Sequence, residues 1–397
     1  MSAVAEVDVP APARRASLWV GIAIVLVAIN LRPAVVAVAP MLEQIRAAEG
    51  LSATAAGVLS ALPVLCFGLF APLAPVLGRR FGIERSLLAT LLVLCVGFVV
   101  RLAPSLVALY VGTVLLGAAI AVGNVLLPSL IKRDFPHRTG LMTGIYTMAI
   151  SAGGGIAAGV TVPVAEAAGL DWRMALGAWG LLAGVGLLCW LPQLRGAGHR
   201  ISVAGARVAA LRRDPVAWQV TAFMGLQSMS FYGLAAWLPA VYVGRGYSPA
   251  TAGWLLSLAS ITAIIGSLAA PTLATRAPKQ SLLAAAVTAL SGSGLLIILA
   301  VPGWEVVGTS VLGIGQGACL GMALTLMAVR APDAQHAAKL SGMAQSAGYV
   351  VAAAGPFVVG ALHDLTGGWT VPLLVVLLMF VPQAVAGALA GRPRLVG

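Results

Sequence analysis

The chain has 397 residues, of which 60% are hydrophobic and only 9% are charged, and its mean hydropathy is +1.00. This composition excludes an ordinary soluble globular protein, in which about a quarter of the residues are charged. The formal net charge of +12 is dispersed over short segments without an accompanying aromatic-basic patch, so no nucleic-acid partner is expected.

Apolar stretches of about 20 residues, long enough to cross a ~30 Å hydrocarbon core as helices, recur along the chain. They are continuous and rich in Ala, Leu and Gly, unlike the alternating strands of a membrane β-barrel. We therefore predict an all-α membrane protein with twelve transmembrane helices, at residues 17–42, 52–77, 84–102, 105–131, 139–164, 172–193, 216–243, 249–274, 280–301, 304–329, 338–362 and 369–391.

The first predicted helix contains an arginine, Arg32, directly before Pro33. At ~1.5 Å per residue, Arg32 lies roughly 20 Å along the helix from Leu18, near the middle of the membrane. A charge at this depth costs at least ~2.5 kcal/mol to insert, so it normally faces a cavity or a partner. The acidic residues all fall in tails, loops or helix ends. Two interpretations stay open: contact with an anionic or polarised solute, or a structural arginine bound to backbone carbonyls at a kink at Pro33.

The distribution of the 24 lysines and arginines predicts the topology, because positive residues are retained on the cytoplasmic side. Nineteen fall in tails and loops on one side, Arg32 lies within the membrane, and four fall on the other side: Arg46, Arg101, Arg173 and Arg245. Both termini are therefore predicted to be cytoplasmic, in a multi-pass protein of the inner membrane. Basic residues after the second and fourth helices are assigned to the gate: Arg79, Arg80, Arg85, Lys132 and Arg133.

A polar interval near the middle of the chain divides the twelve helices into two sets of six. The sets repeat one another at an offset near 196 to 198 residues, as in the pairs Gly57 and Gly253, and Gly144 and Gly342. Such a duplication is typical of transporters whose two halves rock around a central site. The predicted organisation is an N-terminal tail (1–16), a first bundle (17–194), a cytoplasmic linker (195–214), a second bundle (215–391) and a C-terminal tail (392–397).

Polar and aromatic residues on several predicted helices are candidates for a solute site around Arg32. For each of them, a hydrogen bond between helices or ordinary packing is the alternative interpretation. A transporter site of this kind has mostly apolar walls with a few oriented donors. The candidates are Asn30, Arg32, Asn124, Tyr146, Gln227, Phe231, Tyr232, Gln316, Gln345 and Tyr349. The sequence predicts no metal site and no cofactor.

Three segments resemble one transporter family. They are Asn30-Leu31-Arg32-Pro33-Ala34, the run from Gly123 to Pro136 (GNVLLPSLIKRDFP) and the run from Gly140 to Tyr146 (GLMTGIY). These segments, together with Phe231 to Leu234 and Ala236 to Pro239, are similar to the cyanate/nitroimidazole transporter family (CynX/NimT) of the major facilitator superfamily. The resemblance covers nearly the whole chain and implies two pseudo-symmetric six-helix bundles with transport by alternating access. It also implies that the cavity is lined by helices 1, 4, 7 and 10.

The chain departs from the broader superfamily motifs at two places. Arg79 stands where an aspartate is usual, and Thr113 stands where drug/proton antiporters carry an arginine. We therefore expect a transporter of a small anionic or polar planar solute, such as cyanate, a nitroimidazole-like compound or a short organic acid, with a multidrug efflux antiporter as the alternative. A membrane enzyme or sensor is disfavoured, because no catalytic dyad or output domain is present. The expected partners are the solute, the lipid bilayer and, as a coupling ion, protons; a monomer is expected.

Overall fold

The computed structural model describes residues 14–135, 138–196, 211–276 and 280–396. The N-terminal half contains α1 (Arg14–Asn30), α2 (Pro33–Val36), α3 (Val38–Glu49), α4 (Ala53–Phe70), α5 (Leu73–Phe81), α6 (Ile83–Leu102), α7 (Leu106–Asp134), α8 (Thr139–Ala168), α9 (Trp172–Gly177) and α10 (Trp179–Trp190). The C-terminal half contains α11 (Pro215–Gly244), α12 (Pro249–Arg276), α13 (Gln280–Ala300), α14 (Glu305–Val329), α15 (Ala334–Ala352), α16 (Ala354–Thr366) and α17 (Thr370–Ala390).

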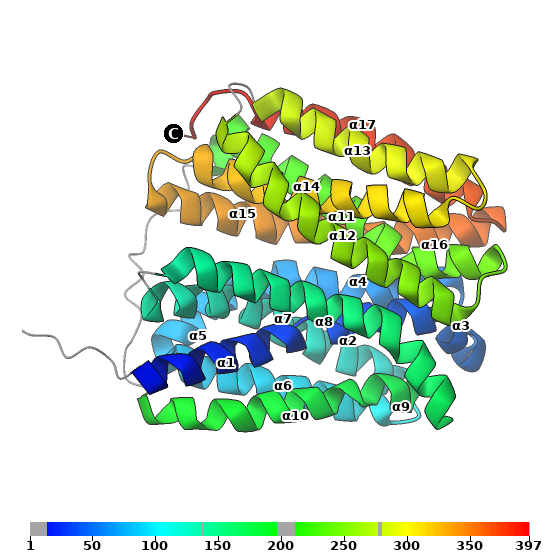
Figure 1. Cartoon of the computed structure of the whole chain (residues 1–397), viewed down its shortest axis with the longest axis horizontal. Helices are drawn as coiled ribbons and strands as arrows, with labels where there is room; N and C mark the ends of the chain where they lie inside the picture. The colour runs from blue at the N-terminus through cyan, green and yellow to red at the C-terminus, as the bar shows by residue number, and fades with distance from the viewer. Residues whose placement is uncertain (1–13, 136–137, 197–210, 277–279, 397) are drawn as a thin grey trace, which may run out of the picture.

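The predicted linker, 195–214, lies mostly on residues 197–210, outside the described residues. Two short 3-10 turns flank that interval, η2 (Leu191–Gly196) and η3 (Leu211–Arg213). Figure 1 shows the two halves as separate bundles that lie side by side, with their helices running along the long axis of the molecule.

Eleven spans among the described residues are long and apolar enough to cross a membrane. The twelfth, α11, is 30 residues long, and at ~1.5 Å per residue it also exceeds the thickness of the hydrocarbon core. Its hydropathy is lowered by Gln227, Ser228 and Ser230, which are all buried within the protein. These polar groups therefore face protein rather than lipid, and the prediction of twelve helices in two six-helix bundles is confirmed.

The outer surface of the bundles is apolar. Leu181, Leu282 and Leu378 are 77%, 76% and 67% exposed, which would be unfavourable in water. In a bilayer the same side chains contact lipid tails. The chain is therefore a multi-pass membrane protein.

The first transmembrane helix is broken into three pieces at the predicted kink. Pro33 begins α2, and it has no backbone N–H to continue the hydrogen-bond ladder of α1. Arg32, at φ −116° and ψ −37°, occupies the N-cap position of α2, and its side chain makes no capping hydrogen bond. A second break at Ala37 separates α2 from α3. Broken helices in membranes leave backbone groups that need other partners, and such breaks commonly line a binding site.

The two ends of the molecule differ in charge. We call the end that carries Arg79, Arg80, Arg85 and Lys132 the basic end, and the opposite end, at which α3, α8 and α16 terminate, the far end. At the far end, three helices terminate in glycines with positive φ: Gly50, Gly169 and Gly367. Glycine adopts this left-handed conformation without strain, and the resulting turn directs the chain back into the membrane.

Candidate functional site

Arg32 lies at the break in the first helix, between the two bundles. Its side chain is half-buried and makes no hydrogen bond or ion pair within the described residues. Its guanidinium carbon lies 5.9 Å from the ring centre of Phe231 in α11, which belongs to the other bundle. A guanidinium at this distance from an aromatic face is attracted to the ring, but its five N–H donors stay available.

The position of Arg32 depends on the glycines of α8. A Cβ added at Gly154 would lie 3.4 Å from the Cβ of Arg32, and one added at Gly153 would collide with the carbonyl oxygen of Ile29. Larger residues at these positions would push α8 away from the break. The two glycines thus allow α8 to pack directly against the backbone that carries the arginine.

Four aromatic rings from three helices form a cluster beside Arg32. Tyr232 of α11 lies 5.0 Å from Phe231, 6.2 Å from Phe67 of α4 and 6.3 Å from Tyr349 of α15, measured between ring centres. All these pairs are edge-to-face, the arrangement that aromatic quadrupoles favour. Arg32 is within electrostatic reach of the phenols of Tyr232 and Tyr349. The structure therefore brings three of the predicted site residues together with the arginine. Phe67 was missed, because a phenylalanine in an apolar run cannot be distinguished by sequence from one that faces lipid.

Tyr146 of α8 extends this group on the N-terminal side. It is also within electrostatic reach of Arg32, and its hydroxyl donates to Oδ1 of Asn124 in α7 at 3.5 Å. Both residues were predicted site members. One cation, several aromatic faces and a few hydroxyl and amide groups can together hold a planar group that carries negative charge.

Gln227 and Gln316 lie in the interior of the C-terminal bundle. Nε2 of Gln227 donates to Ser228 within its own helix at 2.6 Å, and Nε2 of Gln316 donates to Ser230 at 3.3 Å. Oε1 of Gln316 is buried without a partner among the described residues. The two glutamines are therefore held in the interior of one bundle, whereas Gln345 is half-buried in α15 and forms no hydrogen bond in the described part of the chain.

Asn30 points away from the site. Its amide donates to the carbonyl of Leu26 at 2.8 Å and to that of Leu182 in α10 at 3.2 Å. The residue is 2% exposed and joins two helices of one bundle. The structure thus does not bring Asn30 together with Arg32, although only one residue separates them in the sequence, because the helix ends between them.

The position of Arg101 differs from the one predicted from the distribution of positive charge. It was counted with the loops of the far side, but it is 2% exposed and lies inside the N-terminal bundle. There it donates to Thr113 of α7 and to the backbone of α2. The placement was wrong because an arginine at the end of an apolar run is expected to extend toward water, whereas this one turns inward. Arg32 is therefore not the only guanidinium within the membrane.

The predicted gate residues lie at the basic end and form contacts within their own bundle. Arg133 pairs with Glu84 at 2.5 Å and with Asp134 at 2.6 Å, and Arg80 lies over the ring of Phe81 at 5.3 Å. Arg79, Arg85 and Lys132 are exposed. Among the described residues, none of the five forms a hydrogen bond or ion pair with the other bundle, so their role in a gate stays a prediction.

The bundles instead meet closely at the far end, through residues that were not predicted. The carboxylate of Asp364 in α16 accepts the backbone N–H groups of Ala53 and Thr54 at 2.9 and 2.7 Å, and the Thr54 hydroxyl at 2.6 Å. One bundle thus caps the N-terminus of a helix, α4, in the other. A Cβ added at Gly57 would lie 2.6 Å from the oxygen of Pro356, so α4 and α16 pack with their backbones in contact.

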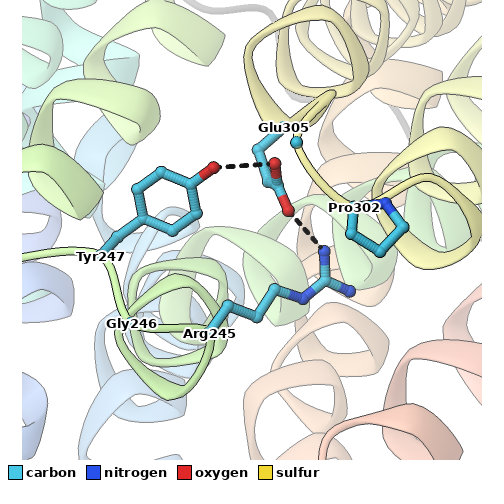
Figure 2. Close-up of a pocket in the computed structure, with 6 residues that line it drawn as sticks. Arg245, Gly246, Tyr247, Pro302 and Glu305 are labelled. Carbon is cyan, nitrogen blue, oxygen red and sulfur yellow. Dashed lines mark hydrogen bonds and ion pairs between the residues drawn. The ribbon is translucent and has the colours of Figure 1, made fainter.

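A hollow at the far end lies within the C-terminal bundle. It has a volume of about 440 Å³ and is lined by Arg245, Gly246, Tyr247, Pro302, Gly303 and Glu305. Figure 2 shows Arg245 and Tyr247 both turned toward Glu305, at 3.0 and 2.9 Å. The hydrogen bond from the Tyr247 hydroxyl to Glu305 raises the pKa of Tyr247 above its usual range. The charges of Arg245 and Glu305 are paired with each other, which favours a structural role for this hollow over binding of a solute.

Two six-helix bundles with a cation and aromatic groups between them are the architecture of a membrane transporter. The family model described as Major Facilitator Superfamily matches residues 18–356 and 245–394. The chain is 39% identical to the 2-nitroimidazole transporter of Escherichia coli (strain K12), over 94% of this chain and 95% of the relative. It is 31% identical to the cyanate transport protein CynX of the same organism, over 90% of this chain and 96% of the relative.

The chain therefore belongs to the Major Facilitator Superfamily, in its cyanate/nitroimidazole transporter family, and the resemblance seen in the sequence motifs is confirmed. A solved structure of a bacterial homologue of the human lysosomal transporter Spinster, in an inward-facing and unoccupied conformation, has the same fold. It matches with a TM-score of 0.79 at 15% identity, and the match covers 96% of this chain and 98% of that chain.

Proposed function

We propose that this chain transports a small planar solute, either anionic or bearing a polarised acceptor such as a nitro, carboxylate or cyanate group, by alternating access of its two bundles. The observation that carries this proposal is Arg32, a permanent cation between the bundles with no hydrogen bond or ion pair within the described residues. Two relatives of the chain are named as transporters of 2-nitroimidazole and of cyanate, and both solutes fit this description.

Recognition follows from the chemistry of the guanidinium. Its planar fork donates two parallel hydrogen bonds to one acceptor group, and such charge-assisted bonds are about twice as strong as neutral ones. Phe231 holds one side of the arginine, and the tyrosine hydroxyls of the cluster supply further donors. The edges of a planar solute would thus meet donors, while its faces meet aromatic rings.

The orientation follows from the distribution of charge. We place the basic end, with both termini, in the cytoplasm, because lysine and arginine are retained there. Cβ atoms added at Gly144 and Gly342, toward the basic end of α8 and α15, would meet nothing within 4 Å, whereas the far end is closed by Asp364 and Gly57. We accordingly infer that the molecule faces inward in the inner membrane.

The test is transport of 2-nitroimidazole and of cyanate by Arg32→Ala and Arg32→Lys, with the amount of protein in the membrane measured in parallel. Loss of a charged hydrogen-bond partner is expected to raise KM by roughly tenfold or more for Arg32→Ala, with partial recovery for lysine. Arg276→Ala, at an exposed helix end, is the matched control and should have no effect.

Unchanged kinetics of Arg32→Ala would overturn the proposal. Resistance to many unrelated compounds that survives Arg32→Ala would instead favour a drug antiporter. A rise in the melting temperature on addition of the solute, present in the parent protein and absent in Arg32→Ala, would support direct binding.

A further inference from the structure

Arg101 is a second guanidinium inside the N-terminal bundle, and nothing in the proposed function uses it. Its Nε and Nη2 donate to the hydroxyl oxygen of Thr113 at 3.2 and 3.0 Å, and its Nη1 donates to the carbonyl oxygen of Ala34 at 3.0 Å. Within the described residues it has no carboxylate partner. A charge buried in a membrane protein is costly and normally serves a function.

The carbonyl of Ala34 accepts no hydrogen bond from the helix backbone, because the first helix is broken there. Across the break, the N–H groups of Val36 and Ala37 donate to the oxygens of Arg32 and Pro33, but α3 does not begin until Val38. The usual fourth-residue bond from Val38 to Ala34 is thus missing, and a buried carbonyl without a partner is unfavourable by about 1–3 kcal/mol. Arg101 supplies the missing donor.

The surrounding helices provide room for this contact. A Cβ added at Gly112 of α7 would lie 2.8 Å from the Cγ of Arg101, and one added at Gly97 of α6 would lie 3.2 Å from the carbonyl oxygen of Gly112. The glycines let α6 and α7 approach until the arginine side chain fills the space between them and reaches α2. Thr113 stands at the position where drug antiporters carry an arginine, and here it accepts from an arginine of the neighbouring helix.

We propose that Arg101 is a positioning residue that holds the break in the first helix and thereby sets the direction of Arg32, two residues before Ala34. This inference rests on the proposed role of Arg32. The guanidinium suits the task because it donates to two acceptors on different helices at fixed angles. A lysine has the same charge but a single nitrogen, and it cannot reproduce the fork.

The hydroxyl of Thr113 allows a matched pair of variants. Thr113→Val keeps the shape and removes the acceptor, whereas Thr113→Ser keeps the acceptor. We expect Thr113→Val and Arg101→Lys each to raise the KM for 2-nitroimidazole by roughly tenfold at unchanged protein level, and Thr113→Ser to stay within twofold of the parent. Equal kinetics for the valine and serine variants, or parent-like kinetics for Arg101→Lys, would overturn the proposal.

A double-mutant cycle with Arg32→Lys separates positioning from general stability. If Arg101 acts through Arg32, Arg101→Lys adds less than about twofold in the Arg32→Lys background, because coupled residues are not additive. Effects that multiply would contradict the inference and leave the role of Arg32 intact. Parent-like transport by Arg32→Ala would instead remove the proposed function itself.

A further measurement requires no transported solute. In a background without the native cysteines, Arg32→Cys is reacted with a small charged thiol reagent, and Gly144→Cys serves as the reference. Arg101→Lys should change the rate at position 32 by at least about fivefold, the lower end of the effect of losing one hydrogen bond, and leave the reference rate unchanged. An unaltered rate at position 32 would show that the break does not depend on Arg101.

Discussion

The contact of Asp364 with α4 allows the closure of the far end to be tested quantitatively. Asp364→Ala removes three hydrogen bonds that cross between the bundles, two of them from the N-terminal backbone of α4. Loss of a helix cap typically costs about 1 kcal/mol, and the interaction of a carboxylate with the helix dipole adds ~0.3–1 kcal/mol. Because Asp364 is exposed, solvent screening keeps the sum at about 1–2 kcal/mol. The ratio of far-end-closed to far-end-open molecules should therefore fall roughly 5- to 30-fold.

The assay is the distribution of distances between spin labels at the far end, one in each bundle. Ser105 and Val301 are exposed there, and in a background without native cysteines they can be replaced by cysteine and labelled. Asp364→Ala should increase the population with a long distance, and Asp364→Asn, which keeps an oxygen acceptor but no charge, should have a smaller effect. Asp171→Asn is the matched control, because Asp171 caps α9 within its own bundle. An unchanged distribution for Asp364→Ala would refute the reasoning.

Three further changes give distinct outcomes. Phe231→Leu removes the ring beside the guanidinium, an interaction of about 0.5–1 kcal/mol, so the KM for 2-nitroimidazole should rise about two- to fivefold in transport assays. Asn30→Ala breaks the bond to Leu182 between α1 and α10, which should lower the melting temperature through a loss of about 0.6–1.7 kcal/mol while the KM stays the same. Gly57→Val places a side chain against a carbonyl of α16 and should disfavour far-end closure by about 1–3 kcal/mol. The spin-label experiment measures this shift. Gly144→Val is the control, because the space around Gly144 is open, and it should leave the distances unchanged.

The fold could be predicted because its signals are local. A run of apolar residues needs only its own composition to specify a membrane helix, and the excess of arginine on one side needs only counting. The one helix that departs from simple hydropathy, α11, was still recognised because its polar residues are spaced between apolar ones. The break at Pro33 was predicted from the missing N–H of a single residue.

The site could be predicted only in part, because its geometry depends on contacts between helices. Asn30 and Arg32 are neighbours in the motif, but the end of α1 between them directs one toward α10 and the other toward α11. Arg101 is 67 residues from the carbonyl it binds, and no periodicity connects them. The contact of Asp364 with Thr54 joins residues 310 positions apart, so it became visible only once the bundles were placed together.

The internal repeat predicts that the far end closes as a unit. Gly57 and Gly253 correspond in the two halves, and both lie where backbones cross between bundles: a Cβ at Gly253 would lie 2.5 Å from the oxygen of Ala158 in α8. The other corresponding pair, Gly144 and Gly342, faces open space on both sides. The repeat thus pairs α4 with α16 and α12 with α8 by the same operation, and both contacts lie on the same side of Arg32. If one rotation of the bundles separates both contacts together, weakening either contact should shift the whole equilibrium. We then expect the surfaces around Gly144 and Gly342 to meet when the far end opens.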